Sequence, residues 1–324
     1  MKNFWRDLNF PILAMAPMVG ITDSAWRRLV KSWGADVVYS EMIASEALIR
    51  GAYKALKMMD FEAAEQPFVV QLMGNKPEVM AQAAKLAAER GAAGIDINFG
   101  CPANKIAKNY CGVMLMRDLE LSHQIIEAVI KAVAVPVSLK VRTSINCQGH
   151  NYKNKDMVSI LEFLEHMQDM PIAAVMIHGR SFEAPFDGDI DHQMIREAKK
   201  IFTNGPLLAN GGVATVEDAG RVLELTQADG LGLARCALGK PWVFKQIKEY
   251  LATGSYKEVG WQETKEAMLE HARLFYKFYG QDFFKPMRRH LAHYTKGLEK
   301  ASEIRQQLVR TNSPQEVAEV LSNH

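Results

Sequence analysis

The sequence has little cysteine, and its cysteines are scattered. Its 324 residues contain four, Cys101, Cys111, Cys147 and Cys236, and no two of them have the C-x-x-C spacing. Because that spacing marks cysteine zinc sites and redox dithiols, neither is expected, and we predict no bound metal. Four isolated thiols also argue against a disulfide framework and indicate a reducing compartment.

Long apolar runs and a large excess of one charge are missing as well. No stretch approaches the roughly 20 apolar residues of a membrane helix, and the N-terminal segment MKNFWRDLNFP has no cleavage signature. The net charge is +2, so a nucleic-acid site would need local clustering of Lys and Arg. We therefore expect a cytoplasmic monomer that does not enter membranes.

What the sequence does contain is a regular alternation of apolar runs and helix-like segments. The runs occupy residues 12–17, 36–41, 68–73, 94–99, 136–141, 173–178, 206–211 and 230–235. Nearly continuous apolar runs are typical of parallel strands that are buried on both faces. A doubly wound sheet is the alternative, but no G-x-G-x-x-G follows the first run. The pattern predicts an α/β protein with a (β/α)8 TIM barrel over residues 1–253.

From residue 254 to 324 the pattern predicts helices without strands, and hence a small helical bundle domain. If residues 285–298 form a helix, Lys285, Arg289, His293 and Lys296 share one face, with Arg288 beside it. Met287, Leu291, Tyr294 and Leu298 then form a roughly opposite apolar face. Such a basic stripe is either a solvated helix face or a phosphate-binding surface.

Polar residues gather at the C-terminal ends of the predicted strands, where TIM barrels carry their active sites. They are Gln71, Asn98, Cys101, Lys140, Arg142, His178, Arg180, Asn210, Gly211, Gly212, Ala234 and Arg235. The last five follow the seventh and eighth strands. The loops after these two strands usually bind phosphate in this fold. A phosphorylated ligand is one interpretation, and a ligand-free glycine turn is the other.

Each of these residues also has a purely structural interpretation. A free cysteine is commonly a small buried apolar residue, but Cys101 lies in a loop at the predicted mouth, where a thiol can donate a proton. Lys140 ends an apolar strand and needs a partner there. His178 could be a satisfied core histidine, and Gln71 could be a structural hydrogen-bonding group.

Seven stretches resemble the tRNA-dihydrouridine synthases, most closely the bacterial B-type branch. They are APMVGITDSAWR (16–27), QLMGNKPEVMAQAA (71–84), DINFGCPANKIAKN (96–109), PVSLKVRTS (136–144), IHGR (177–180), LANGG (208–212) and ADGLGLARCALGKPWVF (228–244). The order and spacing match along the barrel, and the C-terminal segment is similar to that family's helical tRNA-binding domain. The GCP-x-x-K stretch is the most specific of these signals.

The resemblance implies an FMN enzyme that uses NADPH, with NADH as the alternative, to reduce the C5–C6 double bond of a D-loop uridine in tRNA. Hydride would pass from flavin N5 to C6, and Cys101 would donate a proton to C5. The implied FMN ligands are Pro17, Met18, Gln71, Lys140, His178, Asn210, Gly211, Gly212, Ala234 and Arg235. The implied substrate contacts are Asn98, Lys105, Arg142, Arg180, Lys285, Arg288 and Arg289.

Some positions depart from the family pattern. Ala234 stands where Gly is usual, and Ser181, Ala184, Phe186 and His192 replace the usual residues after the sixth strand. The polar loop 144–156 could contact RNA, act as a lid or be merely solvated. Two rival functions stay open: an FMN barrel reducing a free pyrimidine or an enone, and a non-catalytic tRNA-binding protein.

Overall fold

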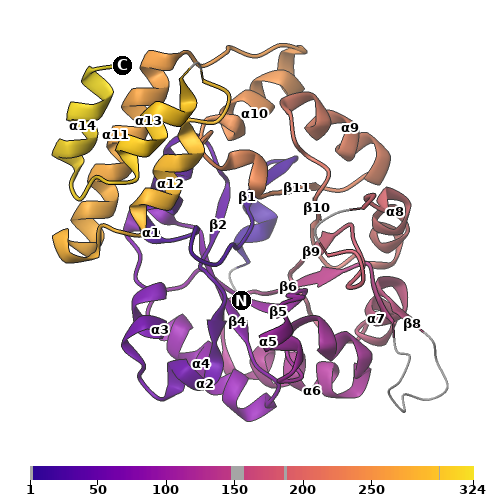
Figure 1. The fold of residues 1–324 in the computed structure, drawn as a ribbon. Helices are drawn as coiled ribbons and strands as arrows, with labels where there is room; N and C mark the ends of the chain where they lie inside the picture. The colour runs from indigo at the N-terminus through magenta and orange to yellow at the C-terminus, as the bar shows by residue number, and fades with distance from the viewer. Residues whose placement is uncertain (1–2, 147–156, 186–187, 299) are drawn as a thin grey trace.

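The computed structural model describes residues 3–146, 157–185, 188–298 and 300–324. Eight parallel strands form a closed barrel (Figure 1). They are β1 (Ile12–Met15), β2 (Val37–Tyr39), β4 (Phe68–Met73), β5 (Gly94–Phe99), β6 (Val137–Arg142), β9 (Ala174–His178), β10 (Leu207–Asn210) and β11 (Gly230–Leu233). The ring closes because β1 pairs with both β11 and β2, and β2 pairs with β4. The predicted TIM barrel is confirmed, and seven of the predicted strands contain one of these eight, while β6 extends one residue past the predicted run 136–141.

Helices surround the barrel as an outer ring (Figure 1). They are α1 (Ser24–Ser32), α2 (Ser45–Ile49), α3 (Tyr53–Met58), α4 (Pro77–Glu89), α5 (Asn104–Ala107), α6 (Leu119–Ala132), α7 (Ile160–His166), α8 (His192–Ile201), α9 (Val216–Thr226) and α10 (Val243–Thr253). Local sequence sets their starts: Pro77 opens α4, and the Asp23 carboxylate caps α1 by accepting from the Trp26 N–H at 3.0 Å. Short 3-10 turns are η1 (Phe4–Asp7), η2 (Ala63–Glu65), η3 (Gly112–Arg117), η4 (Arg235–Ala237) and η5 (Gln281–Phe283).

Two small β elements add to the predicted pattern. The short strand β3 (Ile43–Ala44) pairs with β4, and β7 (Ser144–Asn146) pairs antiparallel with β8 (Met157–Ser159). The start of the predicted polar loop is thus a strand. The rest of that loop, residues 147–156, lies outside the described residues, as does Phe186.

The core has two layers because successive strand residues point to opposite faces. Ile12 and Ala14 of β1 belong to a cluster inside the barrel, which Trp5 joins at the N-terminal end. Leu13 and Met15 belong to the larger cluster between strands and helices. This two-sided burial explains the nearly continuous apolar runs in the sequence.

The C-terminal helices are α11 (Trp261–Tyr279), α12 (Met287–Tyr294), α13 (Ala301–Leu308) and α14 (Pro314–Ser322). They lie together at one side of the barrel, with α11 packed along α1 (Figure 1). Buried residues of these helices, including Phe275 and Leu291, join the outer core of the barrel. Among the described residues, no helix is both long and apolar enough to cross a membrane.

The predicted helix over 285–298 is shorter than expected. Pro286 lacks an N–H and precedes the first helical residue, and Gly297 adopts a positive φ of 86° beyond the end. Lys285 and Lys296 therefore lie outside α12, so the single basic helix face is wrong at both ends. The apolar face is confirmed for Met287, Leu291 and Tyr294, which are buried, whereas Leu298 lies beyond the helix and is half-buried.

Candidate active site

The C-terminal strand ends enclose a cavity of about 300 Å³. Ten of the predicted site residues line it: Pro17, Met18, Lys140, His178, Arg180, Asn210, Gly211, Gly212, Ala234 and Arg235. They come from the ends of β1, β6, β9, β10 and β11, far apart in the sequence. A larger hollow of about 660 Å³ opens at the opposite end of the barrel, beside Asn3, Pro136 and Ala173. TIM barrels carry their active sites at the C-terminal strand ends, and this rule selects the smaller cavity, which has the charged and polar side chains, over the larger hollow.

The glycines after β10 need their lack of a side chain. Gly211 and Gly212 have φ values of 100° and 78°, in the region that side chains disfavour. A Cβ on Gly211 would lie 3.0 Å from the His178 ring, and one on Gly212 would lie 3.3 Å from His192 Nε2. The departure at Ala234 costs little here, because its φ of −136° lies outside the left-handed region. The backbone can therefore approach a ligand closely at this turn.

Lys140 and His178 are the two ionisable groups of the cavity whose pKa values are lowered most. Lys140 donates to Asn210 Oδ1 at 2.9 Å, and Asn210 donates onward to the Gly232 carbonyl. Burial, together with the charge of Arg142, lowers the pKa of Lys140 to about 8. Burial and the cations around it lower the pKa of His178 to about 2, so this imidazole is neutral at pH 7.

A buried polar network lies behind the cavity on β4 and β5. Gln71 donates to Asp96 Oδ2 at 2.7 Å and accepts from Asn98 Nδ2 at 3.0 Å. Gln71 is 1% exposed, so its first role in the structure is to connect these two residues. Ser138 donates to the other oxygen of Asp96, and burial raises the pKa of this carboxyl to about 7. Sequence reasoning missed Asp96, although an acid inside the apolar run GIDINF was a usable signal.

Asn98 also shapes the turn that carries Cys101. Its Oδ1 accepts from the backbone N–H groups of Gly100 at 3.2 Å and Cys101 at 2.9 Å. Gly112 packs directly against this turn, since a Cβ there would lie 2.9 Å from the Cys101 carbonyl oxygen. The Cys101 side chain is half-buried, and Cys101 is not among the residues that line the cavity. Its turn adjoins the strand ends, because Arg142 at the end of β6 donates to the Gly100 carbonyl at 2.8 Å.

The other described cysteines differ from Cys101. Cys111 is 6% exposed, and burial next to Glu46 raises the pKa of its thiol to about 11. Burial also raises the pKa of the Cys236 thiol. Cys111 is thus a packing residue, Cys236 lies half-buried at the cavity wall, and Cys147 lies outside the described residues.

Arg142, a predicted substrate contact, is buried among loop carbonyls at the end of β6. It is 2% exposed and donates to the carbonyls of Gly100, Ser181 and Pro185 at 2.8, 2.9 and 3.1 Å. Its guanidinium thus connects the Cys101 turn to the loop after β9. Arg180 lines the cavity and donates to the Gly188 carbonyl at 2.9 Å.

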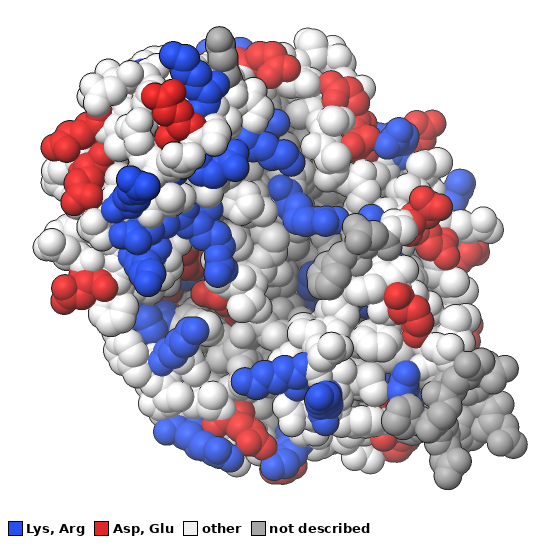
Figure 2. All heavy atoms as spheres, in the orientation of Figure 1, with Lys and Arg blue, Asp and Glu red and all other residues white. Residues whose placement is uncertain are grey.

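The predicted RNA-contacting residues differ in how free their side chains are. Lys105, Lys285 and Arg289 are exposed, and Arg289 lies across the barrel loop at Gly20, with Nη1 3.5 Å from that carbonyl. Arg288 is instead held by Thr311 and Asn312 of the helical segment, at 3.0 and 2.6 Å. Figure 2 shows Lys and Arg around the central hollow and over the C-terminal helices.

Proteins of similar sequence identify the family of this chain. A family model described as "Dihydrouridine synthase (Dus)" matches residues 14–324. A probable tRNA-dihydrouridine synthase of Rickettsia bellii is 37% identical over 307 residues, covering 93% of this chain and 91% of that protein. The tRNA-dihydrouridine synthase B of Pseudomonas aeruginosa is 35% identical over 300 residues, covering 92% of this chain and 88% of that protein.

A solved structure shows the same architecture. The complex of 2-naphthoyl-CoA reductase with 2-naphthoyl-CoA is similar with a TM-score of 0.56 at 13% identity, covering 73% of this chain and 50% of that chain. At this identity the similarity concerns the fold alone. The match to the family over almost the whole length is the stronger finding, and it means that the chain belongs to the dihydrouridine synthase family, on the bacterial B-type branch.

Proposed function

We propose that this enzyme reduces a D-loop uridine of tRNA with FMN held at the strand-end cavity and with Cys101 as the proton donor. The reaction class, formation of dihydrouridine in tRNA by an oxidoreductase, follows from the family. The family also supports a flavin cofactor. The proposal adds the kind of flavin, the reductant and the role of each side chain.

The cavity fits a flavin with a terminal phosphate. Gly211 and Gly212 offer a turn without side chains, and exposed Arg235 lies on the next strand end to pair with a phosphate. His192 Nε2 is buried and has no hydrogen-bond partner among the described residues, and it lies beside the same turn. An anion accepting from this group would remove the cost of an unpaired polar atom. We assign the phosphate of FMN to this position, with Pro17 and Met18 against the ring.

Lys140 is the cation suited to the polar edge of the flavin. Its ammonium group is already aimed by Asn210 and needs no rearrangement to meet a ligand in the cavity. A bound flavin would supply the hydride for C6 of the uracil ring, drawn from NADPH. A positive charge from Lys140 would stabilise the added electrons, and neutral His178 could hydrogen-bond without adding charge.

Cys101 is the residue that would complete the reduction. Reduction at C6 leaves negative charge toward C5, and that carbon must receive one proton to give dihydrouridine. The observation that carries the assignment is the turn itself: Asn98 fixes two backbone N–H groups and holds the half-exposed thiol at the strand ends. A positioned acid of this kind contributes about 10²- to 10⁴-fold to a rate.

The basic surface would hold the rest of the tRNA. A uridine must leave its stack to enter the cavity, and this flipping costs a few kcal/mol. Contacts of Lys105, Lys285 and Arg289 with phosphates can offset that cost, since these three side chains are exposed. We propose that the enzyme acts in the cytoplasm as a monomer.

The test is incubation of the FMN-loaded protein and NADPH with tRNA that lacks modifications. Nucleoside mass spectrometry should find a gain of two hydrogens on one D-loop uridine. A parallel reaction with free uridine should give no product. Reduction of free uridine with unchanged tRNA would instead establish a small-molecule reductase, and a protein that binds tRNA but no flavin would overturn the catalytic proposal.

A further inference from the structure

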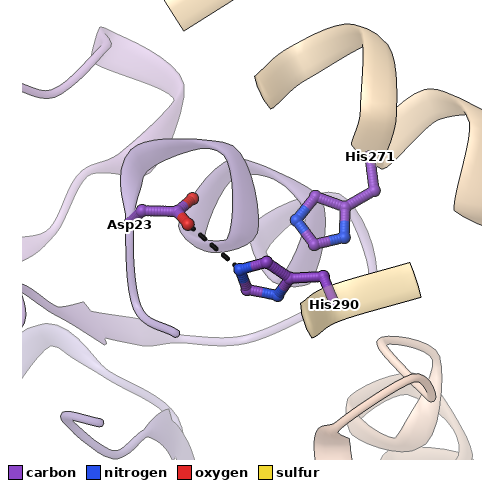
Figure 3. Close-up of side chains that lie close together, drawn as sticks. All are labelled: Asp23, His271 and His290. Atoms are coloured by element: carbon purple, nitrogen blue, oxygen red, sulfur yellow. Dashed lines mark hydrogen bonds and ion pairs between the residues drawn. The ribbon is translucent and has the colours of Figure 1, made fainter. Parts of the chain in front are cut away.

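A second cluster of ionisable side chains lies away from the cavity, at the junction of the barrel and the C-terminal helices. Asp23 caps α1, His271 lies in α11, and His290 lies in α12 (Figure 3). Their exposed fractions are 6%, 0% and 3%. One ligand atom from each, a carboxylate oxygen and two ring nitrogens, lies within 4.8 Å of the others. Nothing in the proposed reaction uses this cluster.

The hydrogen bonds of the cluster leave one atom unused. His290 Nε2 lies 3.1 Å from Asp23 Oδ2, while Asp23 Oδ1 accepts from the Trp26 N–H at 3.0 Å. His271 Nδ1 lies 3.1 Å from the Tyr294 hydroxyl. His271 Nε2 has no hydrogen-bond partner among the described residues, and the ring turns a nitrogen toward Asp23 and His290 (Figure 3).

A buried nitrogen without a hydrogen-bond partner needs an explanation, because leaving such a group unpaired costs about 1–3 kcal/mol of stability. Burial lowers the pKa of His271 well below its usual value, so the ring is neutral and keeps a lone pair. If the ring proton sits on Nδ1 and is donated to Tyr294, the lone pair is on Nε2, which faces the cluster. Outer hydrogen bonds of this kind are how metal-binding histidines are oriented.

We propose that Asp23, His271 and His290 bind a divalent transition-metal ion, with Zn²⁺ as the representative ion. Two imidazole nitrogens and one carboxylate oxygen form a common three-ligand set for zinc and its neighbours. Tyr294 and the Trp26 N–H would serve as outer partners that fix two of the ligands. Binding would replace the present contact between His290 and Asp23, and any proton on His290 would pass to solvent.

A cavity adjoins the cluster on the side of Asp23 and is not lined by either histidine. This cavity, separate from the one at the strand ends, has a volume of about 380 Å³, and Glu41, Phe275 and Tyr279 border it. A water molecule there could complete a four-coordinate ion. The sequence prediction of no metal relied on cysteine spacing, and it did not consider ligands drawn from residues 23, 271 and 290.

The ion would join two parts of the molecule. Asp23 belongs to the barrel, whereas His271 and His290 belong to two different C-terminal helices. Arg289, the neighbour of His290 in the chain, reaches the barrel loop at Gly20. A metal at the cluster would therefore fix the helices against the barrel next to this basic residue.

The experiment uses the untagged full chain, freed of metal and titrated with Co²⁺, whose visible absorption reports coordination. We expect one equivalent of Co²⁺ to bind with visible bands, Zn²⁺ to displace it, and Zn²⁺ to raise the melting temperature. His271→Ala and His290→Ala should each weaken binding about tenfold or more. The control is the double variant His123→Ala with His166→Ala, a surface pair near Asp169 that should leave binding unchanged.

Two results would overturn the proposal. One is a folded wild-type protein that takes up no stoichiometric Co²⁺. The other is binding that the surface double variant loses and the two cluster variants keep. If the cluster variants do not fold, X-ray absorption of the zinc-loaded wild type decides instead: two imidazole ligands support the site, and a different ligand set removes it.

Discussion

Asp96 and Asp23 are both buried carboxyl groups, yet their pKa values move in opposite directions. Asp96 receives hydrogen bonds from Gln71 and Ser138, which are neutral donors, and burial raises its pKa to about 7. Asp23 is also opposed by burial, but the hydrogen bond and charge of His290 hold its pKa below the usual value. The partner, and not the burial alone, decides whether a buried acid keeps its proton.

The two hydrogen-bond networks that contain these acids also differ in how many of their polar atoms have partners. In the barrel, both side-chain polar atoms of Gln71, Asp96, Asn98 and Asn210 have partners. At the junction of the barrel and the C-terminal helices, His271 Nε2 has no hydrogen-bond partner among the described residues. A completed network positions neighbouring groups, as Asn98 does for Cys101. A network that contains an unpaired polar atom can still bind a ligand at that atom.

The largest effect on stability should come from Asp23→Asn, measured in metal-free protein. The amide can still cap α1, but it removes the carboxylate that His290 Nε2 meets at 3.1 Å in a buried site. Breaking one partner of a buried pair costs about 3–5 kcal/mol of unfolding free energy. Urea unfolding at pH 7 measures it, and a loss below about 1 kcal/mol would mean that the pair is not ionised.

A smaller effect, on rate rather than on stability, is expected for Asn98→Ala. The change removes the acceptor of two backbone N–H groups at the Cys101 turn, so the thiol is less well placed. We expect a loss of about 10- to 100-fold in turnover on tRNA with FMN retained. Asn109→Ala is the matched control, because the side chain of this exposed asparagine donates within its own loop, to the Lys105 carbonyl. Equal loss in both variants would refute the positioning role.

The RNA-facing side of the junction gives the next prediction. Lys285→Glu with Arg289→Glu should weaken tRNA binding about tenfold and lower the slope of affinity against salt by about 1 for each phosphate that these side chains bind in the wild type. Lys131→Glu with Lys200→Glu makes the same charge change on outer helices, where both lysines pair with nearby glutamates. Filter binding at several salt concentrations compares the two. An unchanged salt slope in the first variant would mean that this surface does not bind tRNA phosphates.

The smallest effect should come from Asp96→Asn, and the difference in stability between this variant and the wild type should depend on pH. Because the folded pKa of about 7 lies above the ordinary value of 3.8, the folded state holds this proton more tightly, and wild-type stability falls as pH rises from about 4 to 7. The amide removes that dependence. We expect equal stability at pH 5 and a variant more stable than the wild type at pH 8, because the wild type loses stability up to about pH 7. A variant equally destabilised at both pH values would contradict the raised pKa.

Much of the site follows from the sequence because the fold places strand ends together by a simple rule. Lys140, His178 and Asn210 are distant in sequence, yet each ends an apolar run, and the closed barrel brings them to one cavity. The family resemblance then supplies chemical roles that spacing alone leaves open. The limits of the helix at 287–294 were also readable, since Pro286 and Gly297 are both helix-ending residues.

Other features depend on packing that no local pattern encodes. Arg142 ends a strand like Lys140, but loop carbonyls from Gly100 and Pro185 surround it and bury it. Asp23, His271 and His290 meet only because α11 packs on α1 and α12 packs on α11. The orientation of helices against the barrel comes from many apolar contacts, and so the junction cluster required the structure.

The proton from Cys101 is the central claim, and a single comparison tests it most directly. FMN-loaded Cys101→Ala and Cys111→Ala proteins are each given NADPH and unmodified tRNA, and dihydrouridine formation is followed by nucleoside mass spectrometry. We predict that Cys101→Ala keeps its flavin and loses about 10²- to 10⁴-fold in rate, while Cys111→Ala retains the wild-type rate. Wild-type formation of dihydrouridine by Cys101→Ala would contradict the account.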